Sequence, residues 1–334
     1  MEQTQTENQT SQQPKKQIDY SRILRRAYDI TIQHKFLWVF GALIALGSGG
    51  GNFNGGGGSG ESVTPQEQEF FNKIDGFANQ YWLAIIALVA FVFLLLIVIW
   101  VMGTISRGAL IDSANKVDDG IHADIKSGFH RGLHFFWRIF GIGLVFFALM
   151  MVVLAVILTP VIYFIVMKQF APAIFIGIMG LLFFIPIAMF FGIISQLALL
   201  FAVMMERRVF AAISEAYDLL FKNFSAVGLL WLLSIGIGIV GSVVTFFFAL
   251  PLILIAVPFA LGSYAAFQLS GLVITIAVSV IIFMVVMAIV RGVFEVYLQT
   301  FWILGFKELM GEKIKAEENQ KVAAETAASA APAA

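Results

Sequence analysis

The chain has 334 residues, of which 60% are hydrophobic and 13% charged, and its mean hydropathy is +0.90. Soluble domains are about 45–50% apolar and about 25% charged, so this composition indicates a membrane protein. Lysine plus arginine equals aspartate plus glutamate at 21 each, and no basic stripe with interleaved aromatic residues occurs, so we expect no nucleic-acid partner. The lack of cysteine excludes disulfides, thiolate zinc sites and cysteine nucleophiles.

Both ends of the sequence are polar and low in complexity. Residues 1–19 lack the apolar core of a signal peptide and are expected to form an uncleaved, disordered cytoplasmic tail. Residues 307–334 are expected to form a second cytoplasmic tail, mostly disordered beyond a short helix after Gly311. The segment between the tails, residues 20–306, is predicted to be an all-α membrane domain.

The membrane domain is predicted to contain six transmembrane helices. A helix needs about 20 mostly apolar residues to cross a hydrocarbon core about 30 Å thick. Five segments meet this requirement and one, the first, is weaker; the predicted spans are residues 30–47, 81–105, 136–166, 172–203, 225–250 and 268–290. The fourth span is long enough that we expect it to tilt, to kink at Pro186, or to extend past the bilayer.

The first span is short because only residues 36–46, "FLWVFGALIAL", are continuously apolar. A full crossing requires residues 30–35 to extend the same helix, with the ammonium group of Lys35 reaching the interface. The alternative is a re-entrant or interfacial helix. Six spans with both termini in the cytoplasm place eighteen lysines and arginines inside and two outside, whereas omitting the first span gives twelve against eight. The excess of inner positive charge therefore favours the full crossing and a multi-pass protein of the cell membrane.

A glycine-rich segment follows the first span. Residues 47–60, "GSGGGNFNGGGGSG", contain nine glycines, and Gly55, Gly57 and Gly60 match the pattern G-x-G-x-x-G. A dinucleotide site would need a strand before this pattern, a helix that starts at it and an acidic residue about 20 positions after it, whereas here a hydrophobic span precedes the pattern and Glu61 follows it directly. We therefore expect residues 47–64 to form a flexible outer loop rather than a phosphate site.

A helix is predicted to begin directly after this loop. Thr64 is placed to cap it, Pro65 to occupy its first position, and Glu67 to complete a capping box. Apolar residues then recur at helical spacing, so we expect residues 65–80 to form an amphipathic helix on the outer surface that leads into the second span.

The spans also show an internal repeat. Three segments combine an amphipathic lead-in, an aromatic residue, polar or basic residues and an early glycine: residues 27–41, 127–141 and 215–228. The ends of the second span of each pair match as well, in "ISRGALID", "ISQLALLF" and "IVRGVFEV". The pattern predicts three pseudo-repeated helical hairpins, each entered and left through a cytoplasmic amphipathic elbow helix.

These segments resemble a known group of proteins. The stretches "YSRILRRAYDITIQHKFLWVFGAL", "RGALIDSANKVDDGIHADIKSGFHRGLHFFWRIF" and "ERRVFAAISEAYDLLFKNF" make residues 20–306 resemble a family of prokaryotic six-span proteins, related to the membrane domain of glycerophosphoryl diester phosphodiesterases. In those enzymes a separate soluble barrel carries the chemistry, and this chain lacks it. The resemblance therefore implies a membrane module without enzymatic activity.

Two histidines raise the question of a metal site. His130 and His134 are four residues apart, and Asp118, Asp119, His122 and Asp124 precede them in the sequence. However, Gly132 weakens a helix between the histidines, and no HExxH glutamate is present. We favour a lead-in helix that faces solvent or headgroups and expect no metal or cofactor.

Charged residues at the ends of two spans are the candidate lipid or pathway residues. Arg107 with Asp112, and Arg291 with Glu295, occupy related positions in the repeat, and Gln299 shares a helical face with Glu295. Charges within a membrane are costly and often functional. The favoured interpretation is that each arginine binds headgroup phosphates at the inner surface. A pathway for transport is the alternative.

Other polar and small residues within the spans have structural explanations. Ser234, Gly238 and Ser242 recur every fourth position and predict close helix packing within the chain, with a homodimer contact as the alternative. Gln196 and Gln268 are isolated amides for which we expect interhelical hydrogen bonds.

No catalytic constellation is visible in the sequence, so we expect a protein that is not an enzyme. The favoured function is a membrane module that binds lipid, including anionic phospholipid headgroups, or another membrane protein through its elbow helices. The alternative is a transporter or channel for small molecules or ions, since internal repeats and proline-broken helices are common in transporters.

Overall fold

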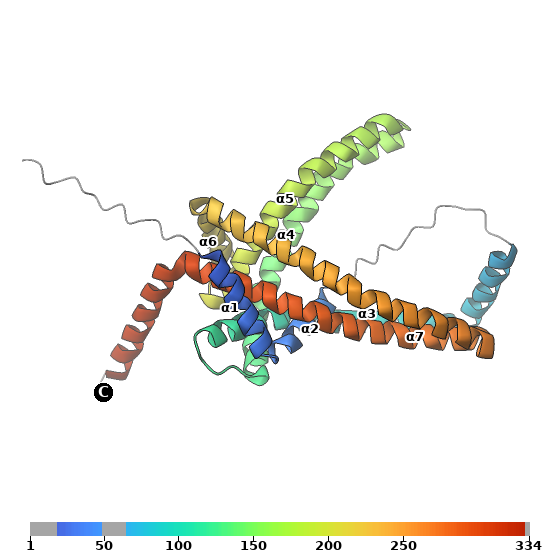
Figure 1. The fold of residues 1–334 in the computed structure, drawn as a ribbon. Coiled ribbons are helices and arrows are strands. Elements are labelled where there is room, and N and C mark those ends of the chain that lie inside the picture. The colour runs from blue at the N-terminus through green and yellow to red at the C-terminus, as the bar shows by residue number, and fades with distance from the viewer. Residues whose placement is uncertain (1–18, 49–64, 331–334) are drawn as a thin grey trace, which may run out of the picture.

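The computed structural model describes residues 19–48 and 65–330 and is all-helical over these residues (Figure 1). The predictions for residues 1–18, for the glycine-rich loop and for the cap at Thr64 lie outside the described residues. The helices are α1 Tyr20–Gln33, α2 Leu37–Gly47, α3 Pro65–Asp118, α4 Ile125–Val166, α5 Phe170–Met204, α6 Val209–Lys222 and α7 Phe224–Ala330. The all-α class is therefore confirmed, and α3 begins at Pro65, where the sequence predicts a helix start.

Five stretches are long and apolar enough to cross a membrane. They are Val89–Asp118, Ile125–Val166, Phe170–Met204, Phe224–Ala265 and Ile274–Gly311, and α1 with α2 would make a sixth if this bent pair counts as one span. The chain is thus a multi-pass membrane protein with five such stretches, or up to six, among its described residues. The arrangement as six spans in three repeats stays a prediction.

α7 contains two of these stretches and folds back on itself (Figure 1). A methyl group on Gly305 would lie 2.8 Å from the Leu230 side chain, and one on Gly241 would lie 3.0 Å from Phe294. Leu230 and Gly241 on the first leg thus lie opposite Gly305 and Phe294 on the second, so the residue numbers run in opposite directions and the two legs form an antiparallel hairpin. The helix continues through Pro251 and Pro258, beyond the span end expected at residue 250. Prolines are tolerated within transmembrane helices when surrounding groups satisfy the freed backbone atoms.

The first apolar segment differs most from its prediction. The helix is broken at His34–Phe36, and α1 and α2 meet at 99°. The Trp38 indole Nε1–H donates to the Thr31 carbonyl at 2.8 Å across this corner, which holds the two helices in their bent arrangement. Residues 30–35 therefore do not extend α2. Its eleven residues reach about 16 Å, roughly half of a hydrocarbon core.

Glycine contacts hold this short helix against α3 and α7. A methyl group on Gly47 would lie 2.7 Å from the Cα of Gly103 in α3. On the other side of α2, a methyl group on Gly41 would collide with the carbonyl of Gly292, and one on Gly292 would collide with the backbone of Ala42. Backbones approach this closely only where both residues lack a Cβ atom.

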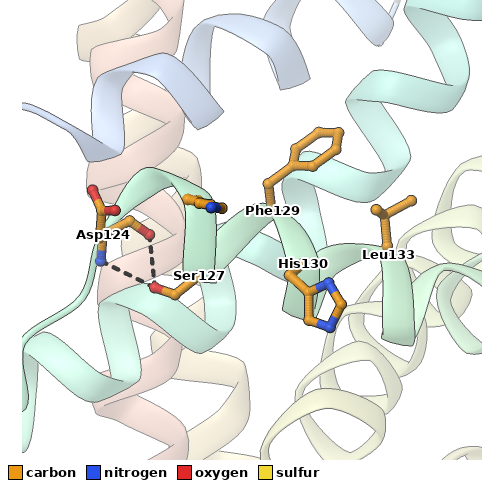
Figure 2. A pocket seen from close by; sticks show the side chains of 6 residues that line it. Asp124, Ser127, Phe129, His130 and Leu133 are labelled. Carbon is orange, nitrogen blue, oxygen red and sulfur yellow. Dashed lines mark hydrogen bonds between the residues drawn. The ribbon is translucent and has the colours of Figure 1, made fainter.

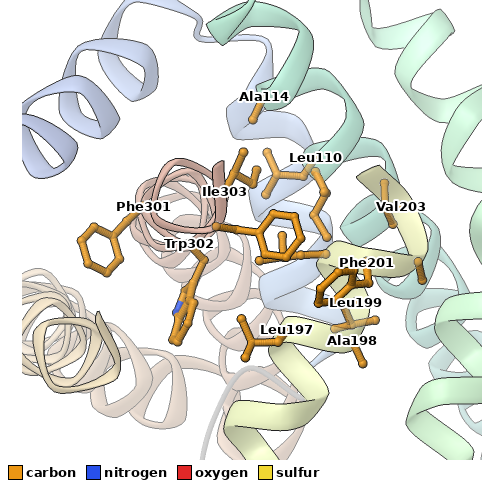
Figure 3. Packing of buried hydrophobic residues seen from close by; sticks show 14 of the residues in the cluster. Leu110, Ala114, Leu197, Ala198, Leu199, Phe201, Val203, Phe301, Trp302 and Ile303 are labelled. Carbon is orange, nitrogen blue, oxygen red and sulfur yellow. The ribbon is translucent and has the colours of Figure 1, made fainter. Parts of the chain in front are cut away.

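The buried core lies at one end of the bundle, which we call the polar end because α1, α6 and most ion pairs lie there (Figures 1 and 3). Phe201 of α5 packs edge-on against Phe306 of α7, with ring centroids 4.9 Å apart. Figure 3 shows further members of this cluster: Leu110, Ala114, Leu197, Ala198, Leu199, Val203, Phe301, Trp302 and Ile303.

Away from the polar end the helices separate, and their apolar side chains are exposed (Figure 1). The α4–α5 hairpin diverges there from the α7 hairpin. Phe93 of α3, Phe183 of α5 and Phe247 of α7 are each more than 60% exposed. Apolar surface of this extent is stable in contact with lipid rather than water.

The C-terminal part of α7 differs from the expected tail. The helix extends through Ala330, although residues 307–334 were expected to be mostly disordered. The sequence "AEENQKVAAETAASA" is rich in alanine and glutamate, which favour helix without tertiary contacts. A polar segment without a hydrophobic stripe is therefore not expected to pack against the bundle, but it can still form a helix.

The glycine contacts lead to a stability prediction. The substitution Gly292→Ala should lower the stability of the protein by about 1–3 kcal/mol, because the added methyl group collides with the backbone of α2. Thermal unfolding of the purified protein in detergent measures this loss. Gly238→Ala is the matched control, because its methyl group would have no neighbour within 4 Å. Equal melting temperatures for the two variants would contradict the close approach of α2 and α7.

Candidate functional site

A chain of polar side chains joins α5 to α7 next to the core. The Gln196 Nε2 of α5 donates to the Gln299 Oε1 of α7 at 2.9 Å. The Nε2 of Gln299 donates in turn to the Glu295 Oε1, one turn earlier, at 3.3 Å. Gln299 is only 5% exposed, so these bonds satisfy polar groups that have no access to bulk water. The interhelical bond expected for Gln196 is confirmed, whereas the Gln268 side chain lies outside the described residues.

The two arginines predicted to mark span ends have different surroundings. Arg291 is exposed and Arg107 is half-buried, and neither forms an ion pair with another described residue. Each is followed by a glycine at a tight helix crossing. A methyl group on Gly108 would lie 2.7 Å from Ile139 of α4, and Gly292 contacts α2 as described above. A role of these arginines in binding lipid phosphates stays a prediction.

The acidic partners suggested by the repeat interact elsewhere. Asp112 accepts from the Lys116 Nζ at 2.6 Å, and Glu295 accepts from Gln299. The pair Asp112–Lys116 has the spacing that places two side chains on one helical face, whereas residues 107 and 112 are five positions apart. Helical geometry therefore pairs Asp112 with Lys116 and leaves Arg107 for other contacts.

An ion-pair network joins α1 to the C-terminal end of α3 and to the second leg of α7. Asp118 accepts from Arg26 at 3.2 Å and from the Lys307 Nζ at 3.0 Å, and Lys307 also contacts Asp119 at 2.6 Å. Arg22 of α1 pairs with Glu308 at 3.2 Å. Asp118 and Asp119, which the sequence offers as metal ligands, are therefore engaged with cations of the protein itself.

The remaining metal-site candidates lie around the start of α4. Asp124 and Ser127 form the capping box of this helix, so the Asp124 carboxylate is already used (Figure 2). Figure 2 shows the side chains of Phe129 and His130 pointing to different sides of α4. Within the described residues, no group of three or more potential metal ligands comes together.

An open pocket of about 510 Å³ lies at the same place (Figure 2). It is lined by Asp124, Lys126, Ser127, Phe129, His130 and Leu133. None of the residues in the Gln196–Gln299–Glu295 chain lines it. The described pocket and the buried polar chain are therefore separate features, and the pocket gives that chain no connection to solvent.

The predicted elbow segments lie in α1, at the start of α4 and in α6, and α1 and α6 each have one buried and one exposed face. α1 buries Ile23, Ala27 and Ile30, and its exposed side includes Arg25 and Arg26. The position of α6 is set by a contact of Val209 with Gly141 of α4 and by the Phe190–Phe221 ring pair at 6.1 Å.

The exposed face of α6 and the neighbouring turn of α4 carry large aromatic side chains. Phe210 at the start of α6 is 77% exposed, Trp137 of α4 is 74% exposed, and Phe221 at the end of α6 and Phe224 at the start of α7 are also exposed. The candidate residues taken from the sequence did not include these aromatics. The signal on α6 is that three of its exposed positions, Phe210, Tyr217 and Phe221, are aromatic.

The polar chain yields a prediction that can be tested by a double-mutant cycle. Gln299→Leu should destabilise the protein by about 1–3 kcal/mol, because it leaves two polar partners without a bond. Gln196→Leu should cost less, and the double variant should show a coupling of about 0.6–1.7 kcal/mol. Denaturant unfolding in detergent gives these values, and Gln169→Leu, at an exposed position, is the control. Strictly additive losses would mean that the Gln196–Gln299 bond is absent.

Comparison with known proteins places the chain in a family but assigns no activity. No curated protein and no solved structure matches it. The comparisons show no link to the glycerophosphoryl diester phosphodiesterases, so that resemblance stays a prediction. One family model matches residues 34–311, which include every helix from α2 to the second leg of α7. The chain therefore belongs to the family of unknown function DUF7544.

Proposed function

We propose that this protein is a non-enzymatic membrane module that binds anionic phospholipids through its elbow helices. The observation that carries the proposal is the combination of exposed aromatic and basic side chains on α6 and on the first turns of α4. Phe210 and Trp137 are among the most exposed large side chains of the chain, and Arg131 and Arg208 are exposed near them. Amphipathic aromatic side chains favour the headgroup level of a bilayer, and basic side chains favour an anionic surface.

The position of these residues along the helices supports the same proposal. α4 has no charged residue after Arg138, and α5 has none at all. The elbow residues thus lie where the uncharged length of the α4–α5 hairpin ends. A helix pair that crosses a bilayer has its headgroup contacts at such a boundary. With both termini in the cytoplasm, as the charge distribution indicates, this boundary faces the inner leaflet of the cell membrane.

The alternative of transport has less support from the geometry. Gln196, Gln299 and Glu295 are bonded to one another, and Gln299 is buried. A substrate pathway requires polar groups that face a water-filled cavity at mid-membrane depth. The three side chains instead act as interhelical contacts, so we base no transport function on them.

Lipid analysis of the purified protein tests the proposed function. After extraction in a mild detergent, the full chain should retain phospholipids in which anionic species are enriched over their share of the source membrane. Quantitative mass spectrometry of the retained lipids gives this ratio. Retained lipids with the same composition as the membrane would contradict the proposal, and a stoichiometric co-purifying protein without bound lipid would favour the partner-binding alternative.

A further inference from the structure

Two arginines of α4 contact Glu206, in the loop between α5 and α6, and the next two residues of that loop are also arginines. Arg138 of α4 donates from Nη1 to the Glu206 carbonyl at 2.7 Å. About two helical turns earlier on α4, Arg131 lies 3.5 Å from the Glu206 carboxylate. Arg207 pairs with Glu215 of α6 at 2.9 Å. We call Arg131, Arg138, Arg207, Arg208, Glu206 and Glu215 the arginine patch.

The arginine patch carries an excess of positive charge. Four arginines face two glutamates, which leaves two more positive than negative charges. The Arg208 side chain is exposed and forms no ion pair or hydrogen bond within the described part of the chain, although its carbonyl accepts from the Ala212 N–H. Arg131 and Glu206 are each nearly half exposed, and their 3.5 Å separation makes this a weak pair. Two guanidinium groups are therefore accessible to an anion from outside the protein.

Aromatic side chains border the patch on the side of the spans. Trp137 precedes Arg138, and Phe210 lies two residues after Arg208; both side chains are about three-quarters exposed. Val209, between Arg208 and Phe210, contacts Gly141, the point on α4 from which its uncharged length continues. Cationic and aromatic groups thus occur at one depth, where α4 leaves the charged region.

From this arrangement we infer that the arginine patch is a binding site for the phosphate of an anionic phospholipid, with Arg131 and Arg208 as its ligands. The planar guanidinium group binds phosphate oxygens in pairs, which a lysine ammonium group cannot do. Exposed Trp137 and Phe210 would contact the glycerol and upper acyl region of the same lipid. This combination fits a lipid rather than a free phosphate, which has no apolar part. The inference rests on the proposed function and names one site for it.

Native mass spectrometry of the full chain in detergent, titrated with phosphatidylglycerol or phosphatidylcholine, tests the site. The wild-type protein should bind phosphatidylglycerol more tightly. The variant R131Q/R208Q should weaken this binding about tenfold, since each basic residue near the surface contributes to attraction of an anionic lipid. The matched control K35Q/K168Q removes the same charge from exposed positions outside the patch and outside α1, α4 and α6, and should change the affinity less than threefold.

Two further variants distinguish phosphate binding from a structural role of the patch. E206Q removes the acid that competes for Arg131, so it should tighten phosphatidylglycerol binding; this result decides the question even if R131Q/R208Q does not fold. R131K/R208K retains the charge but not the paired geometry and should bind with intermediate affinity.

The outcomes separate this inference from the proposed function. If the wild-type protein prefers phosphatidylglycerol but R131Q/R208Q and E206Q bind as the wild type does, the patch is not the site and the wider function stands. An equal loss in the K35Q/K168Q control would also overturn the site. If the wild-type protein shows no preference for the anionic lipid, the proposed function itself fails.

Discussion

The close approach of α2 to α3 and α7 is the contact on which the rest of the architecture depends. α2 is too short to cross a bilayer, and its surroundings are other helices rather than lipid alone. Gly47 with Gly103, and Gly41 with Gly292, allow backbone contact on two of its sides. In lipid, helix association relies on such packing because apolar surface gains little by leaving an apolar solvent. The glycine pairs thus connect α2 to α3 and to the second leg of α7, and Gly41 with Gly292 brings residues more than 240 positions apart into contact.

The polar end adds directional interactions to this packing. The edge-on Phe201–Phe306 contact and the Gln196–Gln299 bond both join α5 to the second leg of α7. Around them, Asp118 and Lys307 connect α3, α7 and α1 through partly buried ion pairs. Interhelical contacts are dense here and sparse where the hairpins diverge. The protein is therefore a set of lipid-facing hairpins held together at one end, and its elbow helices and accessible charges lie at that same end.

Local sequence features predicted several parts of this arrangement. The helix start at Pro65 follows from capping preferences, and hydropathy identifies the five long apolar stretches. The spacing of charged residues indicates which segments leave the membrane. Residue spacing also predicts local pairs, although Asp112 pairs with Lys116 rather than lying beside Arg107. The polar composition of residues 307–334 predicts disorder, whereas α7 extends through Ala330.

The sequence by itself determined that this chain is a helical, multi-pass membrane protein, because hydrophobicity and capping depend on neighbouring residues alone. The tertiary structure decided what depends on distant residues. The bend between α1 and α2 forms where Trp38 bonds to Thr31 and α2 packs against α3 and α7, and hydropathy does not report such contacts. Likewise, Arg131 belongs to α4 whereas Glu206 and Arg208 belong to the loop after α5, and only the tertiary structure brings Arg131 to Glu206. The polar surface that we propose as a lipid site therefore arises from chain topology.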